Sequence, residues 1–213
     1  MIEIEKRILL NKDAYQKLNQ FFLEHSRLEK NFKRFTMVQI GRSDFKADPD
    51  KLLDLRVRTT GEEGTLTAKY GNWHADSARE EYEVHFQTDE IQSLFHILIL
   101  QKYLYFIMSY IERSQYKYED FVITIDKYFS MDAYLMEIEL SVTDASEVST
   151  AENKIDTFLQ TYHLDVLNSD STKNFIQKMN DVEALQVDFT KISVETWFEK
   201  WKESIYCRKA ITI

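Results

Sequence analysis

The chain lacks the residues that mark several common kinds of protein. It contains one cysteine, Cys207, so no disulfide bond can form within the chain, and we expect a reducing, cytoplasmic setting. It contains four glycines and one proline, and no glycine-rich loop that would hold a phosphate through backbone amides. Any phosphate that the protein binds must therefore be held by side chains.

Long apolar runs and an excess of positive charge are also lacking. The most apolar stretch, residues 91–110, is interrupted by Gln101 and Lys102, so we expect no membrane span. The N-terminus opens directly into Glu3 and Glu5, and we expect no signal peptide. The formal net charge of −9 argues against general binding to nucleic acid or to anionic membranes, although it permits a local basic site.

The size of the chain suits one domain. Its 213 residues, 44% of them hydrophobic, are enough for a sizeable core. We expect a main domain over residues 1–180 and a helical tail over residues 181–213 packed on it. The spacing of apolar residues predicts helices near 11–25, 88–98, 149–159, 172–179 and 193–206. A homodimer is compatible with the sequence, which does not fix the oligomeric state.

The chain is rich in charged residues that alternate with bulky ones. In residues 1–10, charged side chains fall mainly on one face of a strand and isoleucines and leucines on the other. One such strand is typical of a sheet surface whose charges meet water. The pattern recurs in residues 55–59, 79–86 and 133–142, and Glu-x-Glu pairs weaken a strand through low β-propensity and repulsion. Solvation alone is therefore a poor explanation.

The order of these motifs resembles that of the CYTH proteins, the triphosphate tunnel metalloenzymes. Glu3-Ile4-Glu5-Lys6-Arg7 is similar to the E-x-E-x-K signature that opens the family. The later matches, in chain order, are Arg56-Val57-Arg58 to R-x-R, Lys69 to a strand lysine, Glu81-Tyr82-Glu83 to E-x-E, Arg113 with Tyr116 to R-x-x-Y, Asp126 to an aspartate that ends an apolar strand, and Glu137-Ile138-Glu139 to a last E-x-E. Charged elements in one shared order, each on a strand-like stretch, make this resemblance specific.

The resemblance implies an α+β fold, an eight-stranded antiparallel β-barrel closed into a tunnel, with flanking α-helices. The sequence offers eight strand-like stretches, a number able to close into a barrel. The charged faces would then point into a wet lumen, because burying so many charges dry and unpaired would cost several kcal/mol each. The apolar faces would point outward and be covered by the helices.

The charges indicate chemistry with a polyanion and a divalent metal. Arginines bind phosphate through forked donors, and paired carboxylates suit Mg²⁺ or Mn²⁺, since no Cys/His cluster suggests zinc. By resemblance, the phosphate-binding residues are Arg7, Arg56, Arg58, Lys69 and Arg113, with Arg7 and Lys69 also catalytic. By resemblance, the metal ligands are Glu3, Glu5, Glu81, Glu83, Asp126, Glu137 and Glu139. We expect Asp126, Glu137 and Glu139 to repel one another unless a cation neutralises them.

The leading hypothesis is a metal-dependent phosphohydrolase for inorganic triphosphate or a small organic triphosphate, such as thiamine triphosphate or a nucleoside triphosphate. One alternative is a class IV adenylyl cyclase, which makes cyclic AMP from ATP. A second is a non-catalytic module that binds polyphosphate or a nucleotide, because Arg7 and Ile111 stand where the family often has lysine. A further alternative makes Arg56 and Arg58 surface residues that pair with Glu81 and Glu83.

Overall fold

The computed structural model of the protein describes residues 2–46, 51–71 and 80–209. The chain divides into two compact units. Unit 1 consists of Met1–Phe32 and Glu112–Asp170, and unit 2 consists of Lys33–Ile111 and Ser171–Ile213. Each unit is therefore assembled from two segments that are far apart in the sequence. The predicted division into a main domain and a tail from residue 181 remains a prediction.

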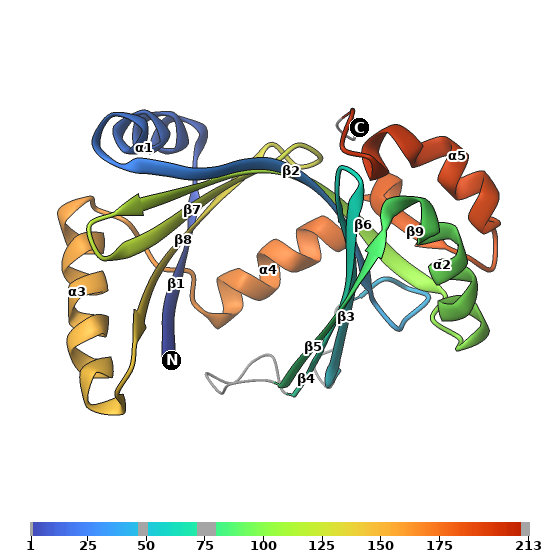
Figure 1. The fold of residues 1–213 in the computed structure, drawn as a ribbon, viewed down its shortest axis with the longest axis horizontal. Coiled ribbons are helices and arrows are strands. Elements are labelled where there is room, and N and C mark those ends of the chain that lie inside the picture. The colour runs from blue at the N-terminus through green and yellow to red at the C-terminus, as the bar shows by residue number, and fades with distance from the viewer. Residues whose placement is uncertain (1, 47–50, 72–79, 210–213) are drawn as a thin grey trace. The chain divides into compact units, whose positions relative to one another are not determined.

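The helices and strands follow the predicted order (Figure 1). The strands are β1 (Ile2–Leu10), β2 (Arg27–Gln39), β3 (Leu53–Thr60), β4 (Glu63–Tyr70), β5 (Glu80–Gln87), β6 (Tyr105–Tyr118), β7 (Phe121–Tyr128), β8 (Ala133–Val142) and β9 (Gln186–Asp188). The α-helices are α1 (Lys12–His25), α2 (Ile91–Leu100), α3 (Val148–Thr161), α4 (Ser169–Asn180) and α5 (Val194–Ile205). Short 3₁₀ helices are η1 (Thr88–Glu90), η2 (Ala145–Glu147) and η3 (Glu183–Leu185). The strand β9 was not predicted from the sequence. No α-helix within the described ranges is long and apolar enough to cross a membrane.

The strands form one sheet in the order β1-β8-β7-β6-β2-β3-β4-β5, and β9 pairs with β6. The predicted α+β class and the antiparallel sheet of eight long strands are confirmed. The prediction of a closed barrel is wrong, because β1 and β5 are the two ends of the order and no pairing joins them among the described residues.

The outer edge of β1 explains part of this difference. The backbone N–H of Leu167 donates to the carbonyl oxygen of Arg7 at 2.7 Å, and Val166 forms a bridge with Ile8. Backbone groups that a further strand would need are thus already used by the segment that follows α3. At the other end of the order, β5 is exposed along nearly its whole length, as expected of an edge strand.

The core of unit 1 lies between the helices α1 and α3 and the apolar faces of β1, β7 and β8 (Figure 1). The side chain of Asn11 caps α1 by accepting from the N–H of Ala14 at 2.8 Å. Phe22 of α1 stacks on Tyr116, and Phe158 of α3 contacts Phe121 with ring centroids 5.5 Å apart. Because the helices cover the apolar face of these strands, their charged residues are left on the opposite face.

The core of unit 2 is built around a fully buried tryptophan of α5. Trp197 packs against Phe95 of α2 with ring centroids 4.8 Å apart, and against Phe35 of β2 at 6.4 Å. Leu55 and Val57 of β3 are buried, whereas the arginines that alternate with them are only half-buried. The same alternation therefore separates an apolar face from a charged face in unit 2.

Candidate functional site

In unit 1, the pairing of β1 with β8 sets charged residues directly opposite one another. Glu5 faces Glu139 and Arg7 faces Glu137, and on the other side of β8 Thr124 of β7 also faces Glu137. All five side chains alternate with residues of the apolar core, so they share the face that α1 and α3 leave uncovered. We call this set, together with Arg113 and Asp126, the unit 1 charged face.

Glu137 is the centre of the ion pairs on this face. Its Oε1 accepts from Nε of Arg7 at 3.0 Å, and its Oε2 accepts from Arg113 at 3.2 Å and from the hydroxyl of Thr124 at 3.1 Å. Nε of Arg7 also lies 2.5 Å from Glu5. Each carboxylate oxygen of Glu137 therefore accepts from an arginine, and both arginines, Arg7 and Arg113, were predicted to bind phosphate.

Asp126 is bound just as closely. Arg113 donates to both of its oxygens, at 2.6 Å and 2.5 Å, in the forked geometry that suits guanidinium and carboxylate. Asp126 is 1% exposed, and the side chain of Arg113 is 19% exposed, so the pair is largely removed from water. The expected mutual repulsion of Asp126 and Glu137 is thus already relieved by Arg113 without a metal ion.

The pKa values of two carboxyl groups on this face, those of Glu5 and Glu137, are shifted in opposite directions. Burial raises the pKa of Glu5, the charge of Glu137 raises it further, and Arg7 only partly compensates. Burial also opposes ionisation of Glu137, but Arg113 and Arg7 outweigh it and hold the pKa of that carboxyl below its usual value. Glu137 is therefore satisfied as an anion, whereas Glu5 gains from any added positive charge.

The donors of unit 1 partly fit a hard divalent cation. Glu5 and Glu139 are opposite neighbours on adjacent strands, and carboxylate oxygens are the ligands that Mg²⁺ and Mn²⁺ prefer. Within the described residues, no three Asp, Glu, His or Cys side chains converge as a preformed metal site. The side chain of Glu3 lies outside the described part of the chain. The fit therefore depends on Glu5 and Glu139, and on ligands other than protein for the remaining positions.

In unit 2, a second charged face extends over β3, β4 and β5. The register sets Arg56 opposite Thr67, Thr67 opposite Glu83, and Lys69 opposite Glu81. Arg56 binds Asp54 through two donors, at 2.9 Å and 2.6 Å. Nζ of Lys69 lies 2.7 Å from Glu81. We call these residues, with Arg58, the unit 2 charged face.

Arg58 is held differently from its neighbours. Its closest hydrogen-bonding partner among the described residues is the hydroxyl of Thr67, at 3.5 Å, and Thr67 in turn donates to Glu83 at 3.1 Å. Burial lowers the pKa of Arg58 to about 10, and the nearby charges of Arg56 and Arg34 contribute to this shift. Arg58 is therefore a cation whose surroundings favour an added anion.

The structure thus distributes the predicted site residues over two faces, each described within its own unit. Unit 1 brings together Glu5, Arg7, Arg113, Asp126, Glu137 and Glu139, and unit 2 brings together Arg56, Arg58, Lys69, Glu81 and Glu83. Three polar partners, Asp54, Thr67 and Thr124, were not predicted from the sequence. Asp54 had a detectable signal, because it continues the period-two pattern of Arg56 and Arg58.

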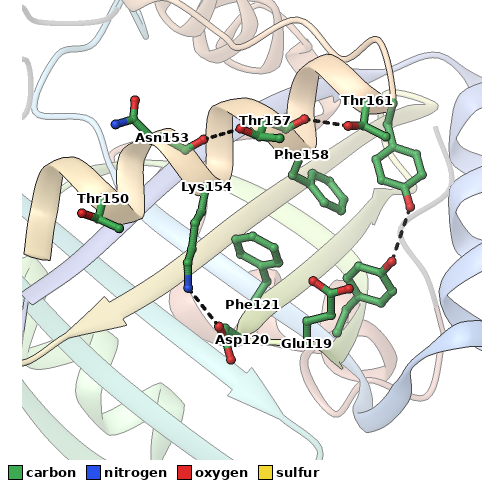
Figure 2. A pocket seen from close by; sticks show the side chains of 11 residues that line it. Glu119, Asp120, Phe121, Thr150, Asn153, Lys154, Thr157, Phe158 and Thr161 are labelled. Atoms are coloured by element: carbon green, nitrogen blue, oxygen red, sulfur yellow. Dashed lines mark hydrogen bonds and ion pairs between the residues drawn. The ribbon is translucent and has the colours of Figure 1, made fainter.

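A cavity of about 560 Å³ lies elsewhere in unit 1, beside α3 (Figure 2). Phe121 and Phe158 form its apolar part, and Lys154 reaches across to Asp120 at 3.2 Å (Figure 2). Phe121 belongs to the apolar face of β7, so the cavity is on the opposite side of the sheet from Glu137. The cavity is separate from both charged faces, and its lysine, Lys154, is already paired with Asp120.

The CYTH domain profile matches residues 1–172. This family includes metal-dependent triphosphatases and class IV adenylyl cyclase-like proteins that act on small triphosphates. A search of curated proteins gave no match.

Several solved structures share the fold at low sequence identity. PH1819 from Pyrococcus horikoshii OT3 is 20% identical, with a TM-score of 0.58 over 83% of this chain and 99% of that one. HpAC1 from Hippeastrum, a candidate adenylyl cyclase with a dominant triphosphatase activity, is 14% identical, with a TM-score of 0.55 over 86% and 99%. A Vibrio parahaemolyticus protein proposed to be an adenylate cyclase is 14% identical, with a TM-score of 0.53 over 79% and 94%. Because the family profile spans most of the sequence, the chain belongs to the CYTH domain family.

Proposed function

We propose that this protein is a metal-dependent phosphohydrolase that acts on inorganic triphosphate or on a small organic triphosphate such as thiamine triphosphate or a nucleoside triphosphate. Arg56, Arg58 and Lys69 bind phosphate oxygens on the unit 2 charged face, and Arg7 and Arg113 do so on the unit 1 charged face. Mg²⁺ or Mn²⁺ is the proposed cofactor, and Glu5 and Glu139 are its best-placed ligands. Within the family, triphosphatases of this kind give the proposal its reaction class.

The observation that carries the proposal is the environment of Arg58. A half-buried guanidinium with a single long hydrogen bond to Thr67 among the described residues retains most of its donors for another acceptor. Phosphate oxygens match the forked geometry of guanidinium, and each such contact is stronger than a neutral hydrogen bond. A polyanion therefore suits this face better than a neutral ligand.

On the unit 1 charged face, phosphate binding would exchange one set of ion pairs for another. Arg7 is half exposed and bridges Glu5 and Glu137, so it has room to turn toward a phosphate. Arg113 is fixed by Asp126 and keeps its orientation while it contacts substrate. A divalent cation supplies a Lewis acid that polarises phosphate oxygens when it is bound. Lys69, positioned by Glu81, is the second residue with a proposed catalytic role, through stabilisation of charge on the phosphate.

Product identification tests this proposal directly. The protein would be incubated with tripolyphosphate, thiamine triphosphate and ATP, each with Mg²⁺, with Mn²⁺ and with chelator, and the products separated by anion-exchange chromatography. We expect inorganic phosphate to be released in a metal-dependent way. Cyclic AMP with pyrophosphate as the product from ATP would establish the cyclase instead.

The third reading, a module that binds without turnover, rests on Arg7 and Ile111 at family lysine positions. Arginine keeps the charge of lysine but not its compact, titratable ammonium group. Tight binding of tripolyphosphate with no product under any metal would establish this reading. Absence of both binding and product would show that none of the three functions belongs to this protein.

A further inference from the structure

Arg34 is a charged residue of β2 that the sequence analysis did not assign to the site. In the pairing of β2 with β3, Thr36 stands opposite Arg58 and Val38 opposite Arg56. Side chains two residues apart on a strand point to the same face, so Arg34 lies on the same face as Thr36 and Arg58. It is half-buried, whereas its neighbour Lys33 is exposed and points to the opposite face.

The register makes Arg34 a diagonal neighbour of Arg58. Diagonal positions on adjacent antiparallel strands are about 7–8 Å apart, which is within reach of two long side chains that approach one acceptor. Arg56 continues the series, two residues away from Arg58 on the same strand. Three guanidinium groups therefore follow one another across β2 and β3 on one face.

The pKa of Arg58 responds to the charges of both neighbouring arginines. After burial, the charges of Arg56 and Arg34 are the main causes that lower the pKa of Arg58 to about 10. Two acidic residues, Asp54 and Glu81, oppose this shift, and Asp54 is bound by Arg56 through both of its oxygens. Mutual repulsion among the cations is relieved best by an anion with several charged groups, each contacted by a different arginine.

We propose that Arg34 is an anion-binding residue of the unit 2 charged face, and that it favours linear phosphates of three or more phosphoryl groups over pyrophosphate. The preference for phosphates rests on the proposed function, whereas the role of Arg34 rests on its position beside Arg58. A longer chain can contact Arg34, Arg58 and Arg56 together, but a shorter one leaves at least one of them without phosphate. Arg34 is then a residue that sets the length of the bound anion.

Strand β2 itself offers a matched control. Lys33→Gln removes one positive charge from the same strand, next to Arg34 in sequence but on the opposite face. Both variants change the net charge of the protein equally, so a general electrostatic effect on anion binding would appear in both. Only a contact on the charged face would appear in Arg34→Gln alone. Arg34→Lys keeps the positive charge and removes the forked pair of guanidinium donors.

Isothermal titration calorimetry with tripolyphosphate and with pyrophosphate, in the presence of chelator, tests the inference without turnover. We expect Arg34→Gln to weaken tripolyphosphate binding about ten- to a hundred-fold, the effect of losing a charge-assisted hydrogen bond. We expect pyrophosphate binding to change much less, and Lys33→Gln to leave both affinities near those of the parent. Arg34→Lys should fall between the parent and Arg34→Gln.

Each other outcome overturns a defined part of the reasoning. Equal affinities for Arg34→Gln and Lys33→Gln would reject the role of Arg34 while leaving the proposed function intact. Equal weakening of both phosphates would reject length selection and keep Arg34 as a general anion contact. A parent that binds neither phosphate would reject the proposed function as well. Thermal unfolding of each variant tests whether it is folded. If Arg34→Gln does not fold, Arg34→Lys takes its place. A ratio of tripolyphosphate to pyrophosphate affinity in Arg34→Lys equal to that of the parent would then reject the inference.

Discussion

Glu5 and Glu139 stand directly opposite one another on β1 and β8, with both carboxyl groups on the unit 1 charged face. Like charges at opposite positions of antiparallel strands destabilise a sheet. Burial raises the pKa of Glu5, the charge of Glu137 adds to the effect, and Arg7 and Arg113 compensate only in part. A cation that binds there would relieve repulsion that the folded protein otherwise contains.

We therefore predict that Mg²⁺ or Mn²⁺ raises the melting temperature of the parent, because a ligand that prefers the native state stabilises it by mass action. Glu5→Gln and Glu139→Gln should each reduce this rise strongly. Glu152→Gln, an exposed acid of α3, serves as the control and should respond to metal as the parent does. A thermal-shift titration in both metals gives the result. If the two site variants respond like Glu152→Gln, this carboxylate pair does not bind the metal.

The opposite shifts of Glu5 and Glu137 predict opposite effects of two similar substitutions. At neutral pH and without metal, Glu137→Gln should destabilise the protein by about 1.5–3 kcal/mol, since charged hydrogen bonds with Arg7 and Arg113 are lost. Glu5→Gln should stabilise it, because the carboxylate is disfavoured in the fold and glutamine still offers Arg7 an acceptor.

The pH dependence of these two effects follows from linkage. The pKa of Glu137 is lowered from 4.5, so its stabilising contribution is present above that value and disappears as the pH falls through the lower, folded pKa. The pKa of Glu5 is raised from 4.5, so the advantage of Glu5→Gln appears only as the pH rises above that value. Melting temperatures of both variants and the parent from roughly pH 3 to pH 8 should therefore converge at the acidic end. Two curves that stay parallel to the parent would contradict the assigned shifts.

The sequence predicted which residues share a face, but not which residues face each other. Period-two alternation assigns Arg7, Glu137 and Arg58 to the charged side of their strands, because alternate side chains of a strand point the same way. Partners depend on register, which long-range pairing and turns decide. The pairing of Arg7 with Glu137 was therefore not readable from the chain, and Glu137 could be judged only by its own strand, where it has no basic neighbour.

The closed barrel was predicted wrongly and Arg34 was overlooked for similar reasons. Closure requires the last strand to find a free edge on the first, and the segment at Leu167 occupies part of that edge through Arg7. No local sequence pattern predicts such a contact. Arg34 lies on β2, but Lys33 beside it obscures the alternation in the sequence, since charge falls on both faces at that point. Only the register with Arg58 separates the two residues.

The pair of Arg113 with Asp126 predicts strong dependence of stability on both partners. Asp126 is 1% exposed, so Arg113→Met would leave a buried carboxylate without its arginine, at a cost of about 3–5 kcal/mol. The double variant Arg113→Met with Asp126→Leu should recover much of this loss, because neither charge remains in the low-dielectric interior. Urea unfolding of the two single variants and the double variant measures the coupling. Additive losses would show that the two residues stabilise the fold independently.

Gly64 links the stability of unit 2 to the geometry of its charged face. It stands opposite Phe86 in the pairing of β4 with β5, and a Cβ at this position would lie 2.4 Å from the phenylalanine ring. The ring thus covers the glycine and helps to fix the register of the two strands. That same register sets Thr67 opposite Glu83 and so supports the hydrogen bond that Thr67 accepts from Arg58.

We predict that Gly64→Ala destabilises the protein by about 1–3 kcal/mol through overpacking and also weakens tripolyphosphate binding. Replacing the ring as well, in Gly64→Ala with Phe86→Leu, should restore both properties in part by making space for the methyl group. Gly61→Ala is the control, since a Cβ there meets nothing within 4 Å and the substitution is strained only by the positive φ of 69°. It should lower stability without changing phosphate affinity. Urea unfolding and calorimetry on the three variants decide the matter: if Gly64→Ala and Gly61→Ala behave alike, packing of Phe86 on Gly64 does not position the charged face.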